Sequence, residues 1–265
     1  MRQDLNGKEL LGVASQLADA AGAVILPYFR GDALSTSNKL EGGFDPVTVA
    51  DRAAERAMRD LLAQLRPQDG ILGEEYGTQE GTSGLTWVLD PIDGTRGFIS
   101  GTPTWGTLIA LADEQGPLMG VIDQPYIGER FVGGFGVADV TGPHGAKTLQ
   151  TKTTTALSDA ILFTTFPEVG SPAERAGFQS VAEQVQLTRY GMDCYAYGLL
   201  AAGQVDLVIE AGLQPYDIQA PIAVIQAAGG VVTDWQGNPA HNGGRCLAAA
   251  TPELHAAALE LLSGV

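Results

Sequence analysis

The chain has 265 residues, which at roughly 100–200 residues per domain allows one large domain or two closely packed ones. Hydrophobic residues make up 45% of the chain and charged residues 17%, a balance that is typical of compact α/β enzymes and excludes disorder and coiled coil. The net charge of −16 would repel a polyanion, so the composition argues against a nucleic-acid partner.

The first half of the chain is predicted to hold two helices followed by a mostly antiparallel sheet. Apolar residues recur at three- and four-residue steps over residues 10–28 and again over 48–66, where Pro67 ends the second pattern. Short apolar runs separated by turn residues then predict strands at 87–89, 108–111, 118–122 and 130–132. Residues 113–117 are typical of a hairpin connection.

Beyond about residue 156, strands and helices alternate. The predicted strands are 161–165, 205–209, 231–234 and 246–250, and the predicted helices are 173–184, 194–202, 217–228 and a last one that begins at Thr251-Pro252-Glu253. This change of pattern predicts two units of an α/β fold. An N-terminal α+β subdomain would span residues 1–150, and a C-terminal α/β subdomain would span 151–265.

The start of the chain and its cysteines indicate a cellular compartment. Residues 1–11 lack the basic flank and apolar core of a signal peptide, and no apolar run has the length of a membrane span. Cys194 and Cys246 do not form a C-x-x-C pair, which argues against a disulfide framework and a thiolate zinc site. We therefore expect a cytoplasmic protein that has no membrane partner.

Several familiar catalytic motifs are absent from the sequence. It contains no G-x-S-x-G, no G-x-x-x-x-G-K-[ST] and no G-x-G-x-x-G after a strand. His144, His241 and His255 are far apart in the chain and stand beside no acidic cluster. Serine-triad and histidine-zinc hydrolysis are therefore poor candidates.

One predicted strand ends at a pair of carboxylates. The apolar run ends at Asp90, Pro91 is expected to stop the strand, and a short helix is expected to begin at Gly94-Thr95. The backbone N–H groups of Gly94 and Thr95 could then bind an anion. Alternatively, Asp93 only stabilises a turn with Gly94, because Asp-Gly pairs are common in turns.

Three further acids stand at comparable places. Glu74 follows the apolar pair Ile71-Leu72 at another strand end, and Asp51 and Asp217 stand near the starts of predicted helices. Each acid has a simpler alternative role. Glu74 could be a solvated loop residue, Asp51 could form a capping box with Thr48, and Asp217 could be an acid favoured at a helix N-terminus.

Together these five acids favour one shared metal site over five separate roles as turn residues or helix caps. Oxygen ligands without Cys or His select a hard cation, and phosphate chemistry makes Mg²⁺ the first choice. If the acids converge, each pair about 4 Å apart would repel by about 4 kcal/mol at an effective dielectric of 20. Bound cations would relieve this repulsion, and they would let a protein of charge −16 receive an anionic substrate.

Four motifs, in order along the chain, resemble the inositol monophosphatase family of Mg²⁺-dependent phosphatases. They are Asp45-Pro46-Val47-Thr48 through Asp51, Gly73-Glu74-Glu75, Trp87 through Thr95, and Tyr216-Asp217 followed by Ala228-Gly229-Gly230. The resemblance implies a layered α-β-α-β-α sandwich that usually forms a homodimer. It also implies a phosphoric monoester hydrolase that acts on a small phosphorylated substrate.

The resemblance also implies a role for each site residue. Two or three Mg²⁺ ions would be bound by Glu74, Asp90, Asp93, Asp217 and the backbone carbonyl of Ile92. A hydrogen-bonded pair of Thr95 and Asp51, together with Glu74, would orient and activate the attacking water. Asp93 and the amides of Gly94 and Thr95 would hold the phosphate. Hydrolysis would occur by in-line attack of this metal-activated water on phosphorus, with no covalent phosphoenzyme.

Three segments within the chain, 98–107, 120–131 and 191–198, resemble the histidinol-phosphate phosphatase branch of that family. The chain has Tyr216 where a Trp commonly precedes the metal-binding Asp, which weakens an assignment to inositol phosphate. Histidinol phosphate carries an ammonium group and an imidazole that acids would recognise, and Glu210 and Asp193 are the candidates.

Alternatives remain for these two residues and for the function. Asp193 could instead cap the following helix, and a neutral polyol could also hydrogen-bond to Glu210. The substrate could be inositol 1-phosphate, a sugar bisphosphate or an adenosine bisphosphate. A non-catalytic metal-binding regulatory protein is a rival from another class, although the presence of Thr95 and Asp51 argues against it. Aspartyl-phosphate phosphatases carry D-x-D, whereas Asp90 and Asp93 are three apart.

Overall fold

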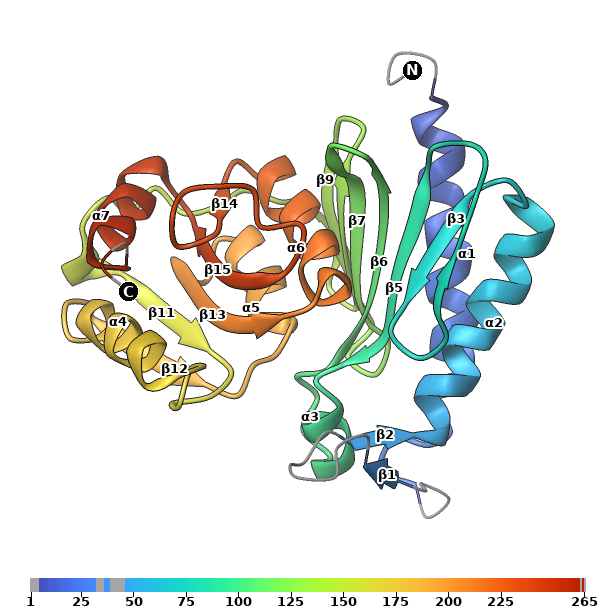
Figure 1. Cartoon of the computed structure of the whole chain (residues 1–265), viewed down its shortest axis with the longest axis horizontal. Coiled ribbons are helices and arrows are strands. Elements are labelled where there is room, and N and C mark those ends of the chain that lie inside the picture. Colours follow the sequence, from blue (N-terminus) through green and yellow to red (C-terminus); the bar gives the residue numbers. More distant parts are fainter. Residues whose placement is uncertain (1–4, 32–35, 39–45, 263, 265) are drawn as a thin grey trace.

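The computed structural model of the chain describes residues 5–31, 36–38, 46–262 and 264. Helices and sheets lie in alternating layers in the order α-β-α-β-α (Figure 1), which confirms the predicted sandwich. Asp45, the first residue of the first sequence motif, lies outside the described residues. No helix in the described part of the chain is long and apolar enough to cross a membrane.

Helices α1 (Gly7–Ile25) and α2 (Val49–Leu65) form the outer layer beside the large sheet (Figure 1). Both were predicted from their apolar spacing, and both bury that face in one core cluster with the sheet. The start of α2 is stabilised by a capping box between Thr48 and Asp51, the simpler of the two roles considered for Asp51. A two-stranded ribbon, β1 (Thr36–Asn38) and β2 (Pro46–Thr48), precedes this helix.

The large sheet has eight strands in the order β10-β9-β8-β7-β6-β5-β3-β4. Its members are β3 (Gly70–Gly73), β4 (Gly77–Gln79), β5 (Thr86–Asp93), β6 (Gly106–Asp113), β7 (Gly116–Gln124), β8 (Glu129–Gly134), β9 (Val137–Gly142) and β10 (Gly145–Thr148). Strands β3 and β5 run parallel and the other neighbours run antiparallel, as predicted for this part of the chain.

The middle layer consists of α5 (Tyr195–Ala201) and α6 (Pro215–Ala227), which lie between the two sheets (Figure 1). Helix α6 is buried over most of its length and packs directly on β7 and β8. Glycines make this close packing possible, because a Cβ at Gly120 would overlap the backbone of Ala220 and one at Gly133 would overlap that of Val224. The N-terminus of α6 is thereby held near the end of β5.

The small sheet has five strands in the order β12-β11-β13-β15-β14. They are β11 (Ile161–Thr164), β12 (Leu187–Tyr190), β13 (Leu207–Leu213), β14 (Val231–Thr233) and β15 (Gly244–Ala249). Helices α4 (Pro172–Ala182) and α7 (Pro252–Leu262) cover its outer face, and a 3-10 turn spans Leu157–Asp159. These helices, and all these strands except β12, match predicted elements.

Candidate active site

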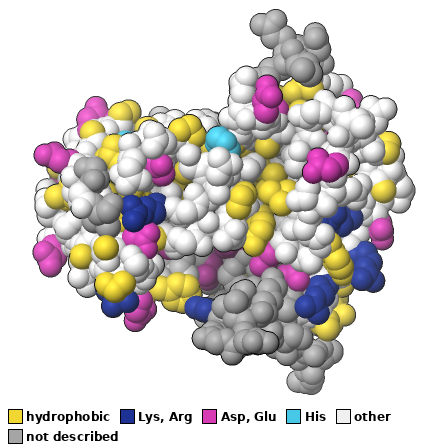
Figure 2. Space-filling model, viewed as in Figure 1, with side chains coloured by type: hydrophobic (Ala, Val, Ile, Leu, Met, Phe, Trp, Pro, Cys, Tyr) yellow, Lys and Arg dark blue, Asp and Glu magenta, His cyan; other side chains and the backbone are white. Residues whose placement is uncertain are grey.

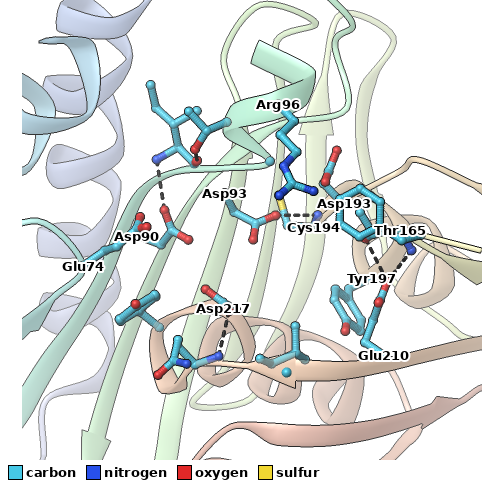
Figure 3. A pocket seen from close by; sticks show the side chains of 18 of the residues that line it. Glu74, Asp90, Asp93, Arg96, Thr165, Asp193, Cys194, Tyr197, Glu210 and Asp217 are labelled. Carbon is cyan, nitrogen blue, oxygen red and sulfur yellow. Dashed lines mark hydrogen bonds between the residues drawn. The ribbon is translucent and has the colours of Figure 1, made fainter. Parts of the chain in front are cut away.

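A pocket of about 420 Å³ lies between the end of β5 and the small-sheet side of the molecule (Figure 3). The described residues of its wall include every predicted site residue except Asp51: Glu74, Asp90, Ile92, Asp93, Gly94, Thr95, Asp193, Glu210 and Asp217. Arg96 is the only basic residue among the described residues of the wall. Figure 2 shows Asp and Glu side chains in a hollow between the two halves of the molecule.

The two carboxylates on β5 lie on either side of a bulge. The prediction that Pro91 ends the strand is wrong, because β5 continues to Asp93 with a register shift between Asp90 and Asp93. A proline fits here because the bulge does not need its missing N–H, and the buried Thr107 hydroxyl donates to its carbonyl at 2.8 Å. The extra residue changes where the two acids point.

Asp90, Asp93 and Asp217 each place a carboxylate oxygen within 4.8 Å of the others. Figure 3 shows these side chains pointing toward a common space. Burial raises the pKa of Asp90 and of Asp93 well above the usual range, and neighbouring carboxylate charges raise both pKa values further. Three oxygen donors of like charge at this spacing fit a hard divalent cation.

Asp217 also caps the helix that carries it. Its Oδ2 accepts a hydrogen bond from the Gln214 N–H at 2.7 Å, which is the simpler role considered for this acid. The two roles are compatible, because a carboxylate can accept several hydrogen bonds and still ligate a metal. Helix α6 therefore brings the third acid to the two acids of β5.

Glu74 lies beside this group, directly after β3. Its backbone N–H donates to the Leu89 carbonyl at 3.1 Å, which places it next to Asp90 across the parallel pair of strands. The charge of Glu74 contributes to the raised pKa of Asp90, after burial. Glu74 is therefore close enough to Asp90 for the two acids to share a cation site.

Thr95 and Asp51 do not form the predicted hydrogen-bonded pair in this structure. The Thr95 hydroxyl donates to the Ile92 carbonyl at 3.1 Å, whereas Asp51 accepts from the backbone N–H of Thr48 at 2.8 Å and from the Thr48 hydroxyl at 2.5 Å. Burial raises the pKa of Asp51 to about 7. Thr48 satisfies this acid locally, at the start of the same helix, and Asp51 is not among the described residues that line the pocket.

Gly94 forms the turn between β5 and α3 (Thr95–Ser100). Its φ of +83° is unfavourable for other residues, and a Cβ there would come within 2.8 Å of the Asp193 side chain. The predicted short helix is confirmed. This turn places Gly94 and Thr95 on the wall beside Asp93.

The other side of the pocket carries two more acids. Oε1 of Glu210, on β13, accepts hydrogen bonds from the N–H of Thr165 at 2.6 Å and from its hydroxyl at 2.8 Å. Asp193 accepts from the Thr104 hydroxyl at 3.2 Å, and α5 begins without a side-chain cap, so the alternative that Asp193 caps this helix is wrong. Burial raises the pKa of Glu210 to about 7 and that of Asp193 to about 6.

The sequence did not predict several residues of this wall. The Cys194 N–H donates to Asp93 at 2.7 Å, and the Arg96 guanidinium lies 4.8 Å from the centre of the Phe166 ring. Thr165 and Phe166 follow β11 directly. The rule that located Glu74, a polar residue after a buried strand, would also have located Thr165. The contact of Cys194 leaves no comparable signal because it is made by the backbone.

This arrangement can position a phosphate ester only with the help of cations. One end of the pocket holds a compact group of acids and the other holds Glu210, while Asp193 lies beside Gly94, where its charge also reaches Asp93. An anionic phosphate can approach the first end once bound metal reverses the local field. The second end can hydrogen-bond to a polar or cationic group on the remainder of the molecule.

Residues 6–265 match the model of the inositol monophosphatase family. The chain is 45% identical over 227 residues to the bifunctional phosphatase IMPL2, chloroplastic, of Arabidopsis thaliana; the match covers 85% of this chain but only 64% of that longer protein. It is 35% identical to the histidinol-phosphatase of Streptomyces coelicolor over 92% of this chain and 93% of that protein. An inositol monophosphatase structure from Zymomonas mobilis has a TM-score of 0.86 and 38% identity, covering 98% of this chain and 99% of that one. The chain is thus a phosphoric monoester hydrolase of the inositol monophosphatase family.

Proposed function

We propose that this phosphatase hydrolyses L-histidinol phosphate to L-histidinol and phosphate, a step of histidine biosynthesis, and that it requires Mg²⁺. The observation that carries this proposal is a second pair of carboxylates on the pocket wall, the buried Glu210 and the partly buried Asp193, in addition to the Asp90, Asp93 and Asp217 group. Histidinol phosphate has a phosphate at one end and two nitrogen groups at the other. Its charge pattern complements that of the pocket.

Two or three Mg²⁺ ions would be held by Glu74, Asp90, Asp93, Asp217 and the Ile92 carbonyl. The donor set fits, because the oxygens of three of these acids lie within 4.8 Å of one another. The Ile92 carbonyl accepts the Thr95 hydroxyl and retains a second lone pair for a cation. Bound Mg²⁺ would supply positive charge that attracts the phosphate and stabilises the transition state.

The residues of the chain would position the reactants. The phosphate would lie beside Asp93, Gly94 and Thr95. The Thr95 hydroxyl oxygen, fixed by its donation to the Ile92 carbonyl, would accept a hydrogen bond from the attacking water, and Glu74 would border that water on the other side. A catalytic role for Asp51 would require its carboxylate to exchange Thr48 for Thr95 as a partner.

The wall also offers a surface for the imidazole ring of the substrate. Phe166 lines the pocket and is 43% exposed, so a flat ring could stack on the face of Phe166 that the Arg96 guanidinium does not cover. Its neighbour Thr165 holds Glu210, so the flat surface and the carboxylate belong to one segment of the wall. A polyol phosphate has neither an aromatic ring to stack on Phe166 nor a cation to pair with Glu210.

An inositol phosphate is the second candidate substrate, because relatives of both names are similar to this chain at 35% and 38% identity. A neutral polyol could also donate hydrogen bonds to Glu210. We further propose that the protein is cytoplasmic, as its cysteines indicate, and that it is a homodimer, as its resemblance to the family implies. The choice between the substrates depends on whether Glu210 recognises charge.

The test is to replace Glu210 and compare substrates. Glu210→Gln should lower kcat/KM for histidinol phosphate by roughly 10- to 150-fold, which corresponds to the loss of one charge-assisted contact of about 1.5–3 kcal/mol. The kcat/KM for glycerol phosphate should change much less, because that substrate has no cation. The exposed Glu183→Gln serves as the matched control. Equal losses on both substrates, or a wild-type preference for inositol 1-phosphate, would contradict the assignment.

A further inference from the structure

We propose that Glu55, a residue outside the pocket wall, is a positioning residue that fixes Glu74 in the cation site. This inference rests on the proposed function of Glu74 as a metal ligand. Glu55 lies in α2, and its side chain is fully buried. Glu55 belongs neither to the pocket wall nor to the group of Asp90, Asp93 and Asp217. Any effect of Glu55 on metal binding must therefore act through the chain segment that it holds.

The carboxylate of Glu55 binds two successive backbone N–H groups just after Glu74. Its Oε2 accepts from the Glu75 N–H at 2.7 Å, and its Oε1 accepts from the Tyr76 N–H at 3.2 Å. The Arg59 guanidinium donates to the same Oε1 at 2.7 Å, and it also donates to the Gly77 carbonyl. A buried charge with this set of partners holds a turn in one conformation.

Glu74 is therefore fixed on both sides. Its own N–H is tied to the Leu89 carbonyl of β5, and the two residues that follow are tied to Glu55. Leu89 immediately precedes Asp90, so the same contacts set the spacing between Glu74 and Asp90. Without Glu55, the turn after β3 would lose the acceptors that determine where the Glu74 side chain points.

Gly73 shows how closely Glu55 approaches this turn. A Cβ at position 73 would overlap the carboxylate of Glu55. The carboxylate thus lies directly against the backbone of the residue before Glu74. A Gly73→Ala replacement would displace the end of the Glu55 side chain without removing its charge.

A second buried pair at the other end of β3 provides a matched control. Asp69 precedes the first residue of β3, is buried, and accepts from the Arg66 guanidinium at 2.8 Å and from the Trp87 indole at 3.0 Å. Like Glu55, it is a buried carboxylate paired with an arginine at one end of this strand. Unlike Glu55, it is at the end away from Glu74.

The experiment measures the Mg²⁺ dissociation constant by calorimetry, and the Mg²⁺ concentration that gives half-maximal phosphate release, in wild type, Glu55→Gln, Gly73→Ala and Asp69→Asn. Unfolding curves identify which variants fold. Loss of a partner that orients a ligand typically weakens metal affinity by roughly 10- to 100-fold. We expect a loss of this size in Glu55→Gln and in Gly73→Ala, and an affinity close to wild type in Asp69→Asn.

The outcomes separate this inference from the proposed function. If wild type binds Mg²⁺ and needs it, but both Glu55→Gln and Gly73→Ala keep wild-type affinity, the role of Glu55 is wrong and the metal site stands. An equal loss in Asp69→Asn would also overturn it, because the effect would then reflect general destabilisation. If wild-type phosphate release does not depend on Mg²⁺, the proposed function fails and this inference fails with it.

Discussion

Asp217 illustrates how single residues of this molecule carry two functions. Its carboxylate caps α6 through the Gln214 N–H and also lies in the group with Asp90 and Asp93. The cap fixes the direction of the side chain, and the proposed metal site would use that direction. Thr95 can likewise make two interactions at once. Its hydroxyl donates a hydrogen bond to the Ile92 carbonyl, and the hydroxyl oxygen remains available as an acceptor.

Replacing Thr95 should separate orientation of water from metal binding. Thr95→Ala is expected to lower kcat on the order of 10²-fold, the effect of losing a positioned group in proton transfer. The Mg²⁺ concentration for half-maximal phosphate release should stay near wild type, because the carboxylates remain. Thr95→Ser keeps the hydroxyl and should retain most of the activity. Wild-type kcat in Thr95→Ala would mean that another group orients the water.

The packing of whole elements brings the acids together. Asp90 and Asp93 belong to β5, whereas Asp217 belongs to α6, and the glycines on β7 and β8 let that helix lie directly on the sheet. The bulge at Pro91 and the cap at Gly94 then determine the direction of the chain at the pocket. The geometry of the site therefore depends on strands that contribute no ligand.

A larger residue at Gly120 should disturb the site from a distance. Gly120→Ala would push α6 away from β7, so we expect a loss of stability of about 1–3 kcal/mol from overpacking, together with weaker Mg²⁺ binding as Asp217 moves. Gly12→Ala is the control, because a Cβ at this exposed position of α1 meets no atom within 4 Å. It should leave Mg²⁺ binding unchanged. Unaltered stability and affinity in Gly120→Ala would show that α6 tolerates the displacement.

The contact between α7 and β14 should make stability depend on pH. His255 lies in α7, where its Nε2 is 2.8 Å from the Thr233 hydroxyl oxygen, and burial lowers its pKa below the usual value. The unfolded chain then binds a proton at a higher pH than the folded one does. The contribution of neutral His255 to the free energy of unfolding is therefore complete above about pH 6.5, and it is lost as the pH falls through the lowered pKa of His255.

Urea unfolding of wild type and His255→Gln at several pH values between about 7.5 and 5 tests this dependence. The variant should lose less stability than wild type over this range, because it lacks the titrating ring. Other titrating groups affect both proteins alike and cancel in the comparison. Parallel curves for the two proteins would contradict the assigned role of His255.

Much of the fold could be predicted because its elements bury regular apolar patterns. The helices and the central strands fall in this class. Strands β4 and β10 could not be predicted in this way, because all their residues are exposed and only pairing with a neighbour holds them in the sheet. The prediction that Pro91 ends its strand was wrong for a related reason. The strand continues through a bulge, and a bulge is defined by the pairing of β5 with β6, which the residues around Pro91 do not reveal.

The site was predicted to the extent that strand ends and helix starts carry acids. The hydrogen-bond partner of each acid depends on distances in space. Asp51 accepts from the Thr48 hydroxyl three residues earlier in the chain, whereas the Thr95 hydroxyl donates to the Ile92 carbonyl. Contacts made by the backbone, such as the Cys194 N–H on Asp93, are invisible in the residue types. The position of Thr165 after β11 could have been noticed in the sequence, but its hydrogen bonds to Glu210 follow only from the pairing of β11 with β13.

At the scale of the whole molecule, charge connects the fold to its function. A chain of net charge −16 places six acids and one arginine on the described wall of a single pocket. Such a pocket repels phosphate unless cations occupy it. Metal bound by these acids would therefore make the pocket a phosphatase site.

The most direct test is phosphate release from histidinol phosphate with Mg²⁺, with a chelator, and after Mg²⁺ is restored in excess. We expect release with Mg²⁺, its loss in the chelator and its recovery when the metal returns. Asp93→Asn should show little release at any stage while remaining folded, and Asp139→Asn, a replacement of an exposed acid on β9, should behave as wild type. Undiminished phosphate release by the wild-type protein in the chelator would contradict the account.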